Sequence, residues 1–97
     1  MAKHQSNTSE AAAHFKMGNA YKMQEQHQDA IDAFNKAIAA KPDFAAGYYA
    51  VGEAYCELEK YAEALAAFKK VISIEPTGFF ADTAHRLIRQ IEDNLHG

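Results

Sequence analysis

The sequence predicts an all-α fold in which antiparallel helix–turn–helix units stack into a short solenoid of five helices. The first observation behind this prediction is an internal repeat: residues 11–44 and 45–78 are identical at 12 of 34 aligned positions. The second is the recurrence of apolar residues at intervals of three and four, which is typical of helices that bury one face. A period of about 20 to 50 residues indicates stacked units that bury their apolar faces against one another.

Each helix is bounded by its own signals. The first begins near Ser9, because either Asn7 or Ser9 can cap it. Polar residues interrupt the apolar stripe before the second helix, and the second and fourth helices end before Pro42 and Pro76. Short turns between helices of similar length make each pair antiparallel. The predicted helices span residues 9–23, 28–40, 44–57, 61–74 and 78–95.

The stripes also predict the core. Gly18 and Gly52 occupy matching positions inside two helices, where each costs roughly 1 kcal/mol relative to alanine. That cost predicts a helix contact too close for a side chain. The aromatic residues expected in the core are Tyr21, Phe34, Tyr48, Tyr55, Tyr61 and Phe68.

The fifth helix is predicted to close the array. A third repeat would require apolar residues where the chain has Asp82, His85, Arg86 and Arg89. Its apolar residues instead form one narrow seam, consisting of Ala81, Ala84, Ile88, Ile91 and Leu95. The predicted organisation is a flexible arm at 1–8 and one domain at 9–97, with repeats at 11–44 and 45–78 and a capping helix at 79–95.

Composition excludes several classes of function. The 97 residues carry a net charge of −3 without the clustered basic face of a nucleic-acid-binding protein. No apolar run approaches the ~20 residues of a membrane-spanning helix, and the first residues lack the apolar stretch of a secretory signal. The single cysteine indicates a reducing compartment, so we expect a cytoplasmic protein.

No constellation indicates an enzyme, a metal site or a cofactor. None of the five histidines has a second ligand at a spacing typical of closed metal sites. Cys56 has carboxylates rather than a base as its helical neighbours, which disfavours a nucleophilic thiolate. The chain also lacks a glycine-rich phosphate loop and a nucleophile elbow.

The doubled pattern resembles the tetratricopeptide repeat family, whose signature is an aromatic residue, then Leu-Gly and Tyr, followed by Ala, an aromatic residue, Ala and Pro. The departures are mild: His14 replaces a large aromatic residue, and Val71 replaces a small one. The first repeat supplies His14, Met17, Gly18, Tyr21, Ala30, Phe34, Ala37 and Pro42, and the second supplies Tyr48, Val51, Gly52, Tyr55, Ala64, Phe68, Val71 and Pro76. The resemblance implies a right-handed superhelix whose first helices line a concave groove.

The resemblance also implies which residues line that groove. Phe15 and Tyr49 lie off the core stripes and 34 residues apart, and exposed aromatic residues in a groove indicate a partner. An alternative is that the two rings only cover neighbouring helices. The implied groove residues are Phe15, Lys16, Asn19, Lys22, Met23, Tyr49, Ala50, Glu53, Cys56, Glu57, Phe80, Thr83 and Leu87.

Two functions follow from these expectations. The first is a protein–protein interaction module, an adaptor or scaffold, that binds a short segment or helix of a partner in the aromatic groove. Because Lys16 and Lys22 are on the first helix and Glu53 and Glu57 on the third, the expected ligand is apolar with mixed charge. The second is a structural module that buries its groove or a repeat edge in a homo-oligomer, since three repeats are usually needed for a stable array.

One ligand class of the family is not expected. Members that hold the C-terminal carboxylate of heat-shock chaperones use lysine, asparagine and arginine side chains at fixed groove positions. Of those positions, only Asn19 matches here, and the others carry Phe15, Ala50, Phe80 and Ala84. A carboxylate would therefore lack the cations with which it pairs.

Overall fold

The computed structural model describes residues 7–96 and confirms the five predicted helices in their predicted order. Every helix begins and ends within one residue of its predicted bounds. The helices are α1 (Thr8–Met23), α2 (His27–Ala40), α3 (Ala45–Glu57), α4 (Tyr61–Ile74) and α5 (Phe79–His96). None of these described helices is long and apolar enough to cross a membrane.

The start of α1 is fixed by its cap. The backbone N–H of Glu10 donates to Oδ1 of Asn7 at 2.9 Å, so Asn7 rather than Ser9 is the capping residue, and the helix starts at Thr8. The rest of the predicted N-terminal arm, residues 1–6, lies outside the described residues.

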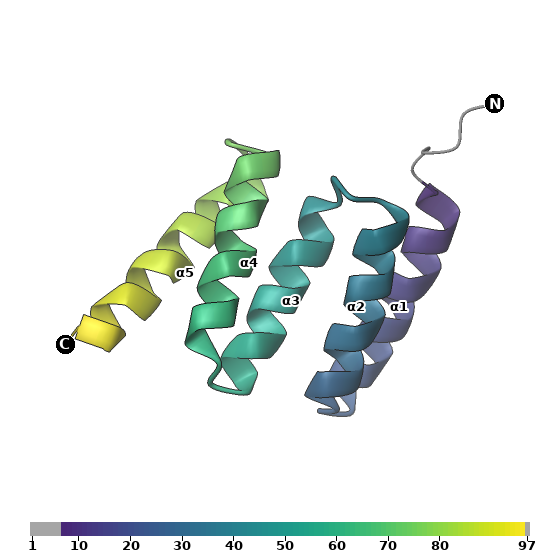
Figure 1. Ribbon diagram of the computed structural model, residues 1–97, viewed down its shortest axis with the longest axis horizontal. Coiled ribbons are helices and arrows are strands. Elements are labelled where there is room, and N and C mark those ends of the chain that lie inside the picture. The colour runs from purple at the N-terminus through teal and green to yellow at the C-terminus, as the bar shows by residue number, and fades with distance from the viewer. Residues whose placement is uncertain (1–6, 97) are drawn as a thin grey trace.

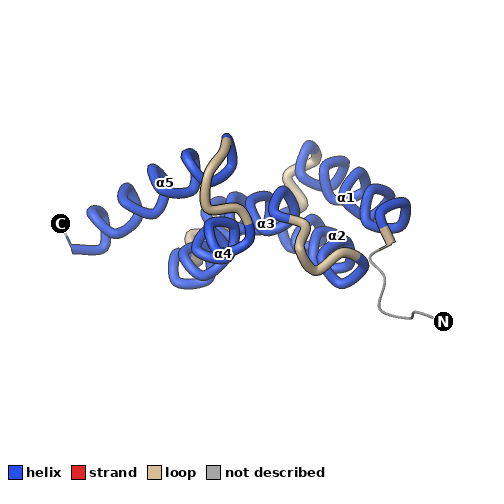
Figure 2. Tube along the Cα trace, turned by 90° about the horizontal axis from the view of Figure 1, so that it is seen from above, coloured by secondary structure: helices blue, strands red, loops and turns tan. Residues whose placement is uncertain are grey.

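The helices are arranged as a single row of antiparallel pairs. Figure 1 shows α1 and α2 at one end, α3 and α4 in the middle and α5 at the other end. Seen from above, α1 and α5 lie on one side of the row and α2 and α4 on the other, with α3 between them (Figure 2). The described chain measures 51 × 31 × 19 Å, so the molecule is elongated along the direction in which the repeats stack.

The two intra-repeat turns have the same geometry. Glu25 and Glu59, which are 34 residues apart, both have a φ of 59°. The residue after each donates a backbone hydrogen bond of 2.9 Å to a tyrosine carbonyl, Gln26 to Tyr21 and Lys60 to Tyr55. The internal repeat therefore extends from the side chains to the backbone of the turns.

The predicted close contact at both glycines is confirmed. A Cβ atom added to Gly18 would collide with the Phe34 ring, and one added to Gly52 would lie 2.6 Å from Cε1 of Phe68. Both phenylalanine rings are completely buried. The ring of the second helix in each repeat thus occupies the space that the missing side chain leaves on the first helix.

Three aromatic core predictions hold only in part and one is wrong. Tyr21, Tyr48 and Tyr55 are half-buried rather than enclosed. Tyr61, at the start of α4, is exposed and lines a small hollow with Ile91, Asn94 and Leu95 of α5.

The apolar seam predicted for α5 is buried or half-buried except at its end. Ala81, Ala84 and Ile91 are buried, whereas Leu95 is 57% exposed. Residues of α5 and α4, with Ala45 and neighbouring side chains of α3, form one apolar cluster. Leu95 lies at the far end of α5, past the residues that pack into this cluster.

Candidate peptide-binding face

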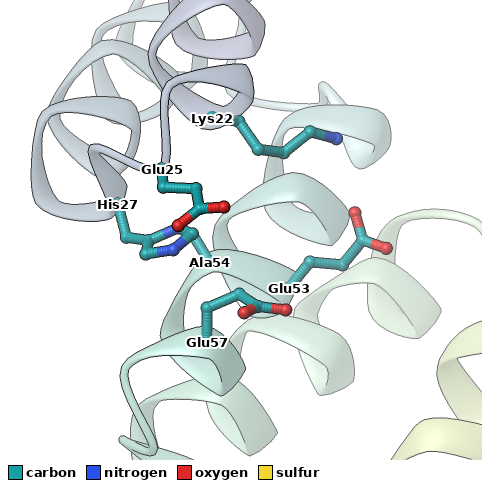
Figure 3. Close-up of a pocket in the computed structure, with 6 residues that line it drawn as sticks. All are labelled: Lys22, Glu25, His27, Glu53, Ala54 and Glu57. Carbon is teal, nitrogen blue, oxygen red and sulfur yellow. The ribbon is translucent and has the colours of Figure 1, made fainter.

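A cavity of about 440 Å³ opens where α1, the turn after it and α3 meet. Lys22 lies near the end of α1, Glu25 is in the turn, and Glu53 and Glu57 are on α3, as Figure 3 shows. Ala54 and His27 complete the lining. The charged groups come from both repeats, so stacking of the repeats creates this cavity.

Aromatic rings form two similar groups, one around Phe15 of α1 and one around Tyr49 of α3. The Phe15 ring of α1 lies 5.4 Å from that of Phe34 and 5.2 Å from that of Phe44. One repeat later, the Tyr49 ring lies 5.8 Å from that of Phe68 and 5.3 Å from that of Phe80. These separations are typical of favourable aromatic pairs, so both half-buried rings also stabilise the junction between successive units.

The carboxylate of Glu53 acts on two neighbouring groups of α3 on this face. Burial, followed by the charge of Glu53, raises the pKa of Tyr49. Burial, followed by the charges of Glu53 and Glu57, raises the pKa of Cys56. The tyrosine hydroxyl and the thiol are thus kept protonated beside a negative potential.

The cavity contains both positive and negative groups. Lys22 lines the cavity together with Glu53 and Glu57 (Figure 3). The described residues contain two ion pairs, Lys41–Asp43 and Lys69–Glu92, and neither lies in the cavity. The charges that line it are therefore available to a ligand.

The predicted groove residues differ widely in exposure. Ala50 and Thr83 are buried, and the Thr83 hydroxyl donates to the carbonyl of Phe79 at 3.0 Å, so these two contribute little to the surface. Those that are exposed are Lys16, Lys22, Met23 and Glu57, and those that are half-buried are Phe15, Asn19, Tyr49, Glu53, Cys56, Phe80 and Leu87.

Sequence reasoning missed three residues of the cavity: Glu25, His27 and Ala54. The first two belong to the polar stretch that was interpreted only as a turn. The left-handed backbone of Glu25 is not signalled by a glycine or asparagine, which are the usual residues there. His27 has a buried Nδ1 atom that lacks a hydrogen-bond partner among the described residues.

Comparison with protein families settles the affiliation of the chain. Two models of the tetratricopeptide repeat match it, one over residues 11–44 and the other over residues 45–77. The chain belongs to the tetratricopeptide repeat family. No curated protein matches it.

Solved structures show the same fold. MamA is 33% identical with a TM-score of 0.85, and the match covers 93% of this chain and 51% of MamA. This chain therefore spans about half the length of that relative. A tetratricopeptide repeat domain protein from Salinibacter ruber is 16% identical with a TM-score of 0.76, over 86% of this chain and 96% of that one.

A third structure contains a ligand. The first tetratricopeptide repeat domain of Spaghetti (RPAP3), bound to an HSP90 peptide, is 20% identical with a TM-score of 0.51, and the match covers 98% of this chain and 100% of that one. At this identity the comparison shows the fold alone.

Proposed function

We propose that this tetratricopeptide repeat protein is a non-enzymatic binding module whose α1–α3–α5 side takes a short segment of a partner protein. The observation that carries the proposal is the mixed-charge cavity between the repeats, which lies on the helices that also bear the Phe15 and Tyr49 rings. A concave site with a few convergent polar groups is the usual form of a binding site. A reducing compartment such as the cytoplasm suits the single thiol, Cys56.

The chemistry of the site favours a ligand with both apolar and charged side chains. The Phe15 and Tyr49 rings each pack against one ring of the same repeat and one ring at the start of the next unit. The remaining surface of each ring offers a flat apolar platform. The carboxylates of Glu53 and Glu57 favour a lysine or arginine of the ligand, and the Lys22 ammonium favours an acidic residue beside it. A uniformly acidic tail would meet three carboxylates in the cavity, which disfavours it.

Panning a library of random peptides against the protein, followed by calorimetric titration of the enriched peptides, tests the proposal. Affinity in the micromolar range, about −8 kcal/mol, is expected. Tyr49→Leu, which keeps an apolar side chain at the junction, should weaken binding about tenfold or more. Lys22→Ala should change mainly the association rate and its salt dependence.

Lys69→Ala is the matched control, because this lysine is exposed on α4 and its side chain lies near Glu92 of α5, away from the cavity. It should leave the affinity unchanged. If the library yields no binders, or if Lys69→Ala weakens binding as much as Tyr49→Leu, the proposed site is wrong. If Lys22→Ala alone abolishes binding, recognition is purely electrostatic and the aromatic platform has no role.

A further inference from the structure

The cavity described above lies at the first of two junctions between successive units, and the second junction, between repeat 2 and α5, is built differently. Residues at equivalent places in the two junctions are 34 positions apart. In place of Glu53 and Glu57 the second junction has Leu87 and Ile91, and in place of Lys22 it has Cys56. Most of the charge at the first junction is therefore absent from the second.

The structure supports this equivalence of the two junctions. The helices α3 and α5 begin 34 residues apart, at Ala45 and Phe79, and both pack on the helix before them. At the second junction Leu87 and Ile91 belong to the apolar cluster, and the hollow beside Ile91 measures only about 120 Å³. The fold therefore accepts apolar side chains where the first junction has carboxylates, so packing alone does not require those carboxylates.

Negative charge is in excess at the first junction. Three carboxylates, those of Glu25, Glu53 and Glu57, line the cavity together with one ammonium, that of Lys22, and with the His27 ring. None of the four charged side chains takes part in an ion pair among the described residues. A cavity lined mainly by one sign of charge attracts a ligand group of the opposite sign, so this one favours a cation.

The arrangement of the acceptors favours a guanidinium over an ammonium. Glu53 and Glu57 are one helical turn apart on α3, whereas Glu25 comes from the turn after α1 (Figure 3). A guanidinium presents five N–H donors in a rigid plane, so it can donate to carboxylates of two elements at once, while an ammonium is a compact point charge. The Nδ1 atom of His27 is buried without a hydrogen-bond partner among the described residues, so no bond through this atom holds the ring in place when a donor enters.

We propose that the cavity binds the guanidinium group of an arginine in the partner segment. This inference rests on the proposed function and adds to it the side chain that anchors the segment. The cavity, of about 440 Å³, lies within the usual range of ligand pockets, about 300 to 1,000 Å³, so one long side chain can enter. The guanidinium donates to the carboxylates, and apolar residues beside the arginine lie against the Phe15 and Tyr49 rings.

Calorimetric titration with three forms of one peptide tests the proposal. The first form is an arginine-containing binder enriched from the random library, and the other two carry citrulline or lysine in place of that arginine. Citrulline keeps the shape but loses the charge, so it should bind at least about tenfold more weakly. Lysine keeps the charge but loses the planar fork, so it should bind several-fold more weakly. N-acetylarginine amide, which carries the side chain without a segment, should bind far more weakly than the peptide.

Protein variants locate the contact. Glu25→Gln and Glu57→Gln should each weaken the arginine peptide several-fold and leave the citrulline peptide unchanged, which isolates the pairwise interaction. Glu59→Gln is the matched control, because Glu59 has the same φ as Glu25 in the equivalent turn and lies outside the cavity. It should change neither affinity. All three glutamates are exposed, and circular dichroism establishes that the variants are folded.

The outcomes distinguish the arginine site from the proposed function. Enriched peptides that lack arginine, or that bind equally well with citrulline or lysine, overturn the arginine site and leave the peptide-binding module in place. A loss with Glu59→Gln equal to that with Glu25→Gln also overturns it, because the effect is then one of general negative potential. If N-acetylarginine amide binds as tightly as the peptide, the cavity is a site for a small guanidino compound and the assignment to a segment is wrong. A library without any binder overturns both proposals.

Discussion

Replacing Gly52 by alanine should destabilise the protein, although alanine is normally the better helix former. A Cβ atom at this position would lie 2.6 Å from Cε1 and 2.8 Å from Cδ1 and Cζ of Phe68. Carbon atoms in contact are ordinarily about 3.5 to 4.0 Å apart, so the ring or the helix must move by about 1 Å. The ring is completely buried, and close-packed neighbours resist that movement.

Two opposing terms set the magnitude. Overpacking a core by one methyl group costs about 2 to 3 kcal/mol when the neighbours cannot move freely. Exchanging glycine for alanine inside a helix returns about 1 kcal/mol. The net loss in the free energy of unfolding is therefore about 1 to 2 kcal/mol, which corresponds to a fall of roughly 5 to 15 °C in Tm for a domain of this size.

Urea and thermal unfolding followed by circular dichroism measure this loss. Combining Gly52→Ala with Phe68→Leu provides the decisive control, because removing the ring atoms relieves the collision. The double variant should lose less stability than the two single variants together, giving a coupling free energy of about 1 kcal/mol. A Gly52→Ala protein more stable than the original, or strictly additive losses, would refute the packing described for α3 and α4.

Three further results are expected from the same methods or from thiol chemistry. Phe68→Ala should lower the free energy of unfolding by about 3 to 5 kcal/mol. Tyr55→Ala should lower it less, because only the phenylalanine is completely buried. Equal losses for the two variants in urea unfolding would contradict this. Glu59→Gly should leave unfolding stability unchanged or raise it by up to about 1 kcal/mol, because the left-handed backbone at this turn disfavours side chains. Cys56 should react with iodoacetamide more slowly than a free thiol at mildly alkaline pH, because burial and then the Glu53 charge raise the pKa of its thiol. Glu53→Gln should therefore speed the reaction. Alkylation stopped at fixed times and at several pH values measures both rates.

The sequence predicted the helices well because local and tertiary signals agree there. Proline marks the ends of two helices, and the paired glycines predict the close contact between helices. Both rules concern backbone geometry, which the sequence encodes directly. Agreement between the local signals for helix ends and the packing between helices is typical of sequences that specify one fold.

Exposure was predicted less well because it depends on which helix lies next to a residue. Met17 and Val51 occupy the same repeat position, yet their exposures differ about tenfold in the structure, 52% against 5%. Tyr61, which was also predicted to be buried, is exposed at the start of α4 beside the end of α5. A repeat pattern describes each unit as if it had two neighbours, and the terminal units do not.

The candidate site lies where the two repeats differ from each other. The positions that hold the fold are shared, as with Phe34 and Phe68, which are both completely buried. Most of the charged lining of the cavity is not repeated: Glu25 aligns with Glu59, but Lys22 aligns with Cys56, which carries no charge while its thiol is protonated, and Glu57 aligns with Met23. Since the glycine–phenylalanine contact inside each repeat requires only shared residues, unshared residues such as Lys22 and Glu57 are free to set ligand preference. Exchanging Lys22 and Glu57 would therefore move the lysine of the cavity from α1 to α3 and change where an acidic side chain of a ligand binds, while leaving the glycine–phenylalanine contacts that pair the helices untouched.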